Sequence, residues 1–119
     1  MQFIEEIGGS IKPGQEVALQ EWLVQNEDAM AKAYPEGSEY LGTYVVIYTS
    51  EKNSGQWRTV VRRDSYAALD RAAAVAKDPN SDLNRLTREF IKFFDSSPAA
   101  PWSRSLYKAV VDATVYKSE

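Results

Sequence analysis

The residues of this sequence that are best suited to chemistry lie in three separate places. Asp112 stands among Val and Ala residues near the C-terminus, where the loss of water would make its carboxylate a stronger general base. The competing interpretation is an ion pair with Lys108 or with an arginine across a sheet. Asn26 falls between Leu23 and Met30 on an apolar stripe, so its amide must bond either a backbone group or a ligand.

The third place is a pair of expected strands with an aromatic and cationic set of residues: Tyr44, Tyr48, Trp57, Arg58 and Arg62. A turn loop with an odd number of residues would set even-numbered residues opposite even ones, and the tyrosines would stand near the arginines. Such a surface suits a planar anionic ligand. A four-residue loop would instead set Trp57 beside Tyr48, because a slip of one residue exchanges the faces. A dimer interface is the plainer interpretation, since Tyr, Trp and Arg are enriched there without any ligand.

Two residue types that commonly carry catalysis are absent. The sequence contains no cysteine and no histidine. This excludes a thiolate nucleophile or metal site, a Ser-His-Asp triad and a histidine-ligated haem. We therefore expect no cofactor, and any catalysis would depend on carboxylates, tyrosines, lysines, arginines or a reactive substrate.

Length and composition are those of one soluble globular domain, residues 1–119. The net charge of -3 and the scattered basic residues argue against a nucleic-acid partner. No apolar run is long enough for a membrane span, and the acidic start is unlike a signal peptide. We expect a cytoplasmic protein without a membrane partner.

The first half of the chain predicts a strand, a helix and a hairpin. Residues 2–7 alternate like a short strand, which the glycine pair after it should end. Residues 15–33 repeat apolar side chains with the period of an amphipathic helix. Residues 40–63 hold two β-rich runs joined by a polar segment that ends in Gly55, which is typical of a β-hairpin. The first run is apolar on both sides, since alternation would place one set of side chains on one face and the other set on the opposite face: Tyr40, Tyr44, Val46 and Tyr48 against Leu41, Val45 and Ile47.

The second half of the chain predicts two helices and a last strand. The first helix, residues 66–76, follows a serine cap and is rich in alanine, which would let it approach a sheet closely. The second helix carries an apolar stripe from Leu83 to Phe94. A loop over residues 95–105 leads to a strand over residues 106–116 with one wholly apolar face.

The order of these elements, β-α-β-β-α-α-β, predicts the α+β fold class. Its simplest arrangement is a ferredoxin-like split βαβ unit: a four-stranded antiparallel sheet with helices on one face and the second helical region divided in two. The other face would still carry Val, Ile, Tyr and Trp, more apolar area than a monomer usually exposes. We therefore expect a homodimer that packs sheet against sheet. The alternative is that the N-terminal segment or the Pro-rich loop folds over that face.

With this order and the two-sided hairpin, the sequence resembles the dimeric α/β barrel superfamily. That group includes antibiotic-biosynthesis monooxygenases, haem-degrading monooxygenases, stress-responsive barrel proteins and NIPSNAP-like proteins. The resemblance is one of pattern and extends from Phe3 to Tyr116. It implies a small homodimer with a ligand cleft between the sheet and the helices of each protomer. The haem-degrading branch would need a histidine ligand, which this sequence lacks.

Two functions follow as expectations. One is a homodimer that binds a small aromatic or anionic molecule without a metal or haem, through Asn26, Tyr44, Tyr48, Trp57 and Arg62. The other, implied by the resemblance, is a cofactor-independent monooxygenase or isomerase-like enzyme acting on an aromatic or polyketide-like substrate. Asp112 is the candidate general base of such an enzyme.

Overall fold

The computed structural model describes residues 2–50, 54–97 and 102–111, and the elements follow the predicted order. The strands are β1 (Phe3–Gly9), β2 (Ser38–Val45), β3 (Trp57–Arg63) and β4 (Ser103–Lys108). The helices are α1 (Glu16–Ala33), α2 (Tyr66–Lys77) and α3 (Asp82–Ile91). Within these described ranges, no helix is long and apolar enough to cross a membrane.

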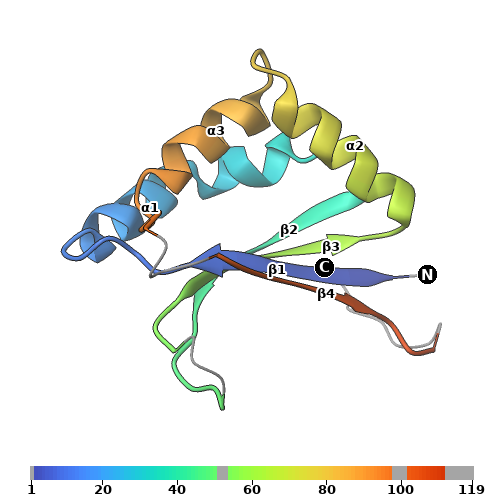
Figure 1. Cartoon of the computed structure of the whole chain (residues 1–119). Coiled ribbons are helices and arrows are strands. Elements are labelled where there is room, and N and C mark those ends of the chain that lie inside the picture. Colours follow the sequence, from blue (N-terminus) through green and yellow to red (C-terminus); the bar gives the residue numbers. More distant parts are fainter. Residues whose placement is uncertain (1, 51–53, 98–101, 112–119) are drawn as a thin grey trace.

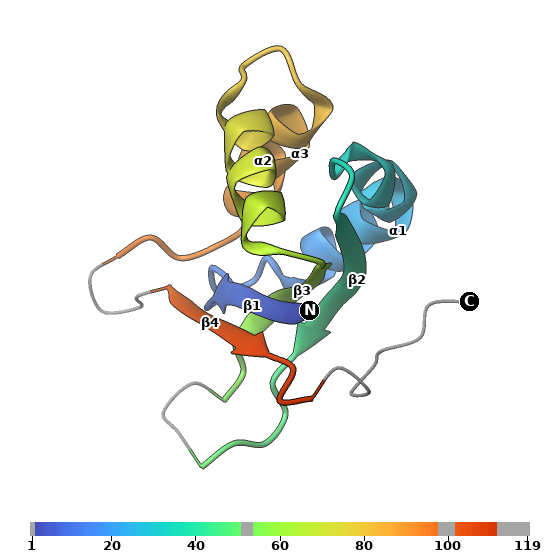
Figure 2. The same cartoon turned by 90° about the vertical axis from the view of Figure 1, so that its right-hand side faces the viewer.

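The four strands form one antiparallel sheet in the order β2-β3-β1-β4. Figures 1 and 2 show α1, α2 and α3 on the same face of this sheet, which we name the covered face. The opposite face, which no described helix covers, is named the open face. The arrangement is the ferredoxin-like α+β fold that the order of elements predicts.

The apolar stripes of α1 and α3 form the core. The core cluster draws on both helices, on β2 and on the segment after α3: Leu19, Leu23, Met30, Tyr40, Leu86, Phe90 and Phe94. Burying side chains of this size stabilises the fold by about 2 kcal/mol each. The predicted helical repeats are confirmed, except that α3 ends at Ile91, so Phe94 packs from the following turn.

Several strand boundaries differ from the prediction. β1 continues through Gly8 and Gly9, because pairing with β3 outweighs the low strand propensity of glycine. β2 ends at Val45 and not near Tyr48, since Val46 bonds both Gln56 and Gly55 and so interrupts the regular ladder. β4 begins inside the predicted loop, where β1 pairs with it. β4 also ends at Lys108, so the strand predicted over residues 106–116 was wrong for residues 109–111, and its part from residue 112 onward lies outside the described residues.

A β-bulge decides which side chains of β2 lie beneath the helices. The pairing of β2 with β3 shifts by one residue between Tyr40 and Gly42. An extra residue inverts the alternation of side chains along a strand. Tyr40 is therefore buried on the covered face, whereas Tyr44 lies on the open face opposite Arg58. The expectation that Tyr40 and Tyr44 share a face was wrong, but the even-with-even pairing of Tyr44 and Arg58 is confirmed.

The open face is more polar than predicted. Trp57, which was expected among its apolar residues, shares the covered side of β3 with Thr59 and Val61. Apolar side chains and ion pairs lie together on the open face: Ile4, Tyr44, Val60, Tyr107, Arg58–Glu6 and Arg62–Glu39. The two pairs have N–O distances of 3.2 and 3.1 Å. Each arginine on this face is therefore neutralised by one carboxylate.

Candidate functional site

A cleft lies between the covered face of the sheet and helices α2 and α3. Its wider part has a volume of about 200 Å³, and its narrower part about 130 Å³. The wider part is lined by Glu5, Ile7, Tyr34, Val61, Arg63, Leu69, Ala72, Ala73, Ala76, Leu83, Thr87 and Arg104. The narrower part is lined by Ile7, Met30, Tyr34, Thr59, Thr87, Phe90, Ile91 and Trp102. The two parts adjoin because they share three lining residues.

The alanines of α2 leave the room for this cleft. Ala68, in the first turn of α2, is buried. Figure 1 shows that α2 then rises away from the sheet toward its C-terminal end. Ala72, Ala73 and Ala76 line the wider part there, and their methyl groups are too short to fill it. The close approach expected of an alanine-rich helix is therefore limited to the start of α2.

The floor of the wider part holds a carboxylate between two guanidinium groups. Arg63 Nη2 donates to Glu5 Oε1 at 2.7 Å, and Arg104 Nε donates to Glu5 Oε2 at 2.7 Å. The side chains of Glu5 and Arg63 are 4% and 8% exposed, and that of Arg104 is 62% exposed. Burial raises the pKa of Glu5, but the hydrogen bonds from the two arginines outweigh it and hold that pKa below 4.5. This floor keeps a net positive charge.

Arg63 is held in place yet retains an unused donor. Its Nη1 donates to Ser38 Oγ at 2.7 Å, and its guanidinium lies 5.6 Å from the ring centre of Tyr34. Its Nε is buried and has no hydrogen-bond partner among the described residues. Burial raises the pKa of Tyr34, so its phenol stays protonated at neutral pH. The cleft therefore presents a fixed cation beside a neutral aromatic ring.

The narrower part of the cleft is enclosed by aromatic and aliphatic side chains. Trp102 stacks on Phe94 with ring centres 4.8 Å apart, and it lines the cavity together with Phe90 and Ile91. Thr59, which is 4% exposed, and Thr87 are the threonines among the residues that line this mainly apolar end. The cleft thus has a cationic floor at one end and an apolar chamber at the other, the pattern of a small-molecule site.

No family model and no curated protein matches this chain. Among solved structures, an uncharacterized NIPSNAP-like domain protein from Burkholderia xenovorans is similar with a TM-score of 0.66 and 10% identity, covering 98% of this chain and 91% of that one. A NIPSNAP family protein from Agrobacterium tumefaciens has a TM-score of 0.65 and 12% identity, covering 98% and 100%. SnoaB, a cofactor-independent oxygenase from Streptomyces nogalater, has a TM-score of 0.54 and 9% identity, covering 96% and 98%.

This chain has a NIPSNAP-like fold. The similarity extends over nearly the whole of each compared chain, so it concerns the complete domain and not one motif. Antibiotic-biosynthesis-monooxygenase-like structures share the fold. The resemblance predicted from the order of elements is thus confirmed for the fold. At such low identities the likeness does not extend to function.

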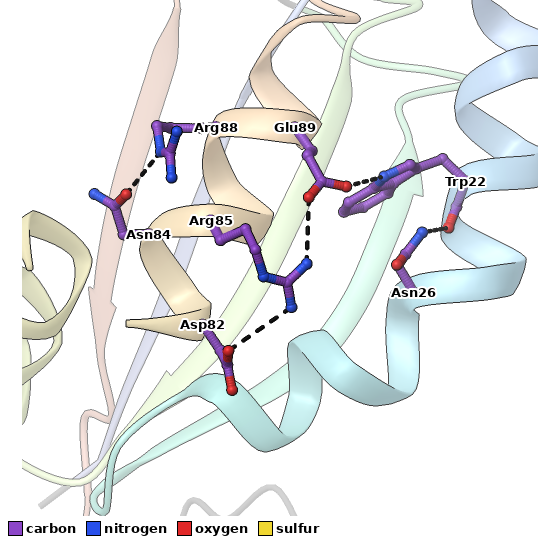
Figure 3. A network of polar contacts seen from close by, with 7 residues as sticks. All are labelled: Trp22, Asn26, Asp82, Asn84, Arg85, Arg88 and Glu89. Atoms are coloured by element: carbon purple, nitrogen blue, oxygen red, sulfur yellow. Dashed lines mark hydrogen bonds and ion pairs between the residues drawn. The ribbon is translucent and has the colours of Figure 1, made fainter. Parts of the chain in front are cut away.

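In this NIPSNAP-like fold, Asn26 lies outside the cleft, on the side of α1 near α3 (Figure 3). Its Nδ2 donates to the carbonyl oxygen of Trp22, one turn earlier, at 2.9 Å. Trp22 Nε1 donates in turn to Glu89 Oε1 of α3 at 3.1 Å. The amide therefore bonds a backbone group, the first of the two alternatives predicted for it, and a contact with a ligand stays a prediction.

The predicted aromatic and cationic set does not converge on the cleft. Tyr44 and Arg62 lie on the open face, and Tyr48 follows the end of β2 with 89% of its surface exposed. Trp57 lies on the covered side, packed against the core. The described lining of the cleft includes none of these four, and it does not include Arg58, which lies on the open face opposite Tyr44. Their part in ligand binding stays a prediction.

The residues that form the floor were not predicted from the sequence. Asp112, the predicted general base, lies outside the described residues. Glu5, Arg63 and Arg104 take the charged positions instead. One signal was available, because Glu5 shares the buried side of its strand with Phe3, and a carboxylate at such a position needs a cationic partner. Nothing in the sequence identified the two arginines as that partner.

Proposed function

We propose that this protein binds a small organic anion with a planar or aromatic body in the cleft of its NIPSNAP-like domain. The observation that carries the proposal is the excess of guanidinium groups on the floor, where Arg63 and Arg104 face the single carboxylate of Glu5. A ligand carboxylate or enolate would balance that charge, and Arg104 is exposed enough to meet it from solvent. The apolar walls would enclose the rest of the molecule.

Binding accounts for this cleft better than acid–base catalysis does. Glu5 is the carboxylate in the described lining, and its lowered pKa makes it a weak base. The raised pKa of Tyr34 makes its phenol a weak acid near neutral pH. Neither group is adjusted for proton transfer at that pH. Oxygen consumption remains the assay for the alternative, since a cofactor-independent oxygenase has the same fold.

The proposal is tested by calorimetric titration with benzoate, salicylate and phenylacetate. We expect Arg104→Gln to weaken the binding of these anions by about tenfold or more, the scale of a lost charge-assisted hydrogen bond. Arg88→Gln, which removes the same charge from α3 outside the cleft lining, is the control and should bind like the wild type. Equal affinity of Arg104→Gln and wild type, or no binding of any of the three anions, would refute the proposal. Native mass spectrometry of the purified protein would detect a ligand that it retains.

We also propose that a second copy of the chain covers the open face. Tyr44 and Tyr107 are 55% and 49% exposed there, and Val60 lies near the centre of the face. Because the ion pairs on this face are one to one, a copy related by a two-fold axis would meet a neutral surface. In sedimentation experiments, Val60→Glu should give a monomer and Val24→Glu, on exposed α1, should remain dimeric. A monomeric wild type at micromolar concentration would refute this assembly.

A further inference from the structure

Four side chains form a chain of hydrogen bonds from the outside of the molecule to the cleft. Tyr40 OH donates to Glu27 Oε2 at 2.8 Å and lies 2.8 Å from Thr43 Oγ1, which lies 3.1 Å from Thr59 Oγ1. Glu27, Tyr40 and Thr43 line an outer groove of about 410 Å³ between α1 and the edge strand β2. Thr59, at the other end, lines the narrower part of the cleft.

The direction of every hydrogen bond in this chain follows from its acidic end. An ionised carboxylate has no proton to donate, so Glu27 can only accept. Tyr40 has one hydroxyl proton, which it donates to Glu27, and its oxygen must accept from Thr43. The proton of Thr43 is then committed to Tyr40, so Thr43 must accept from Thr59. Each hydroxyl thus donates toward Glu27, and none donates toward the cleft.

We infer that Thr59 is a specificity-determining residue that presents only a hydrogen-bond acceptor to the cleft. This inference rests on the proposed binding function and adds a requirement to it: the anion must also carry a hydroxyl or N–H donor that reaches the apolar end. Met30, Phe90 and Ile91 line the cavity around Thr59. A lone pair buried there without a donor is costly, so an otherwise identical ligand without the donor should bind more weakly.

Glu27 determines this preference although it is not among the residues that line the described cleft. A glutamine in its place can donate an amide N–H to the oxygen of Tyr40. Tyr40 could then donate to Thr43, Thr43 to Thr59, and Thr59 into the cleft. The substitution Glu27→Gln therefore allows every one of these hydrogen bonds to reverse its donor and acceptor without changing the shape of the site.

Matched probes test the inference by calorimetry. The probes are 3- and 4-hydroxybenzoate, each against the fluorobenzoate with fluorine at the same position. For the wild type we expect about a fivefold preference for the hydroxyl probe in at least one pair, the scale of one neutral hydrogen bond. Thr59→Val, which keeps the shape but removes the acceptor, should abolish the preference, and Glu27→Gln should reduce it.

Asp28→Asn is the matched control, because Asp28 lines the same outer groove but makes none of the hydrogen bonds that link Glu27 to Thr59. It should keep the full preference. Equal affinity of the wild type for both members of each pair, a preference that survives Thr59→Val, or an undiminished preference in Glu27→Gln would overturn the inference while leaving the proposed binding function intact. If none of the four probes binds, the proposed binding function is contradicted. The inference that the ligand is an anion with a hydrogen-bond donor is then contradicted as well.

Neutron diffraction from deuterated crystals tests the polarity itself without a ligand. The deuteron of Thr59 should point at Thr43 Oγ1, and that of Thr43 at the oxygen of Tyr40. A Thr59 deuteron directed into the cleft would overturn the inference whether or not any probe binds. In crystals of Glu27→Gln, at least part of the Thr59 deuterium should turn toward the cleft.

Discussion

The two faces of the sheet both carry arginine–glutamate pairs, but the pairs differ in ratio and burial. On the covered face, Glu5 accepts from two arginines and its side chain is 4% exposed. On the open face, Arg58–Glu6 and Arg62–Glu39 are single pairs with exposures between 18% and 30%. The covered face therefore holds one more arginine than carboxylate, with Glu5 and Arg63 buried and Arg104 reaching solvent, whereas the pairs of the open face are neutral.

This difference shows what distinguishes the candidate site: it is the excess of arginines over carboxylates, and not the number of charged residues. A buried ion pair is often no more stable than apolar residues of the same volume. The stability of the fold alone therefore does not explain why two arginines bond Glu5. Binding of an anion explains the second arginine better. Neutral, partly buried pairs are compatible with contact against another protein surface.

Removal of one carboxylate from each face should give the largest contrast. Glu5→Ala leaves Arg63 buried without its counter-charge, and we expect the free energy of unfolding to fall by about 3–5 kcal/mol. Glu6→Ala, the next residue along β1, should cost about 1 kcal/mol or less, because its pair is more exposed. Urea unfolding followed by circular dichroism measures both values. Equal losses would contradict the difference in burial.

The glycine pair of β1 gives the next contrast. A Cβ added at Gly8 would lie 1.9 Å from the carbonyl oxygen of Trp57, whereas one added at Gly9 meets its nearest atom at 3.6 Å. We expect Gly8→Ala to destabilise the protein by about 1–3 kcal/mol through overpacking. Gly9→Ala should change the stability by less than about 0.5 kcal/mol. Thermal unfolding compares them, and a fully stable Gly8→Ala would argue against the close approach of β1 and β3.

The two tyrosines separated by the bulge should respond differently to loss of the hydroxyl. Tyr40→Phe removes bonds to Glu27 and Thr43 on the covered side, and we expect a cost of about 2 kcal/mol. Tyr44→Phe removes one exposed bond to the carbonyl oxygen of Leu41, which should cost less than about 1 kcal/mol. The unfolding midpoints in urea measure both. A larger effect at Tyr44 would contradict the assigned faces.

The smallest expected effect is the change with pH in the contribution of Glu5 to stability. Because the pKa of Glu5 is lower in the folded protein than its ordinary value of 4.5, its ionisation stabilises the fold fully above pH 4.5. That contribution is lost as the pH falls through the lowered pKa. The difference in urea midpoint between wild type and Glu5→Gln should therefore narrow as the pH decreases from 7 to 3. A constant difference over this range would show that Glu5 does not titrate in this way.

Most of the fold could be predicted from local patterns, because helix periodicity, strand composition and caps act over a few residues. The helix predicted over residues 15–33 is observed at Glu16–Ala33. The site could not be predicted in this way. Glu5 is 58 positions from Arg63 and 99 from Arg104, and only the strand order β3-β1-β4 brings the three together. Strand pairing over such distances leaves no local pattern.

The sequence by itself determined the element order, the apolar stripes that build the core, and the exclusion of chemistry that needs histidine or cysteine. Tertiary structure decided which face each polar side chain occupies, because a single bulge after Tyr40 inverts the alternation of β2. It also decided that the alanines of α2 line a cleft, because α2 rises away from the sheet toward its C-terminal end and the composition of a helix does not by itself fix its angle to a sheet.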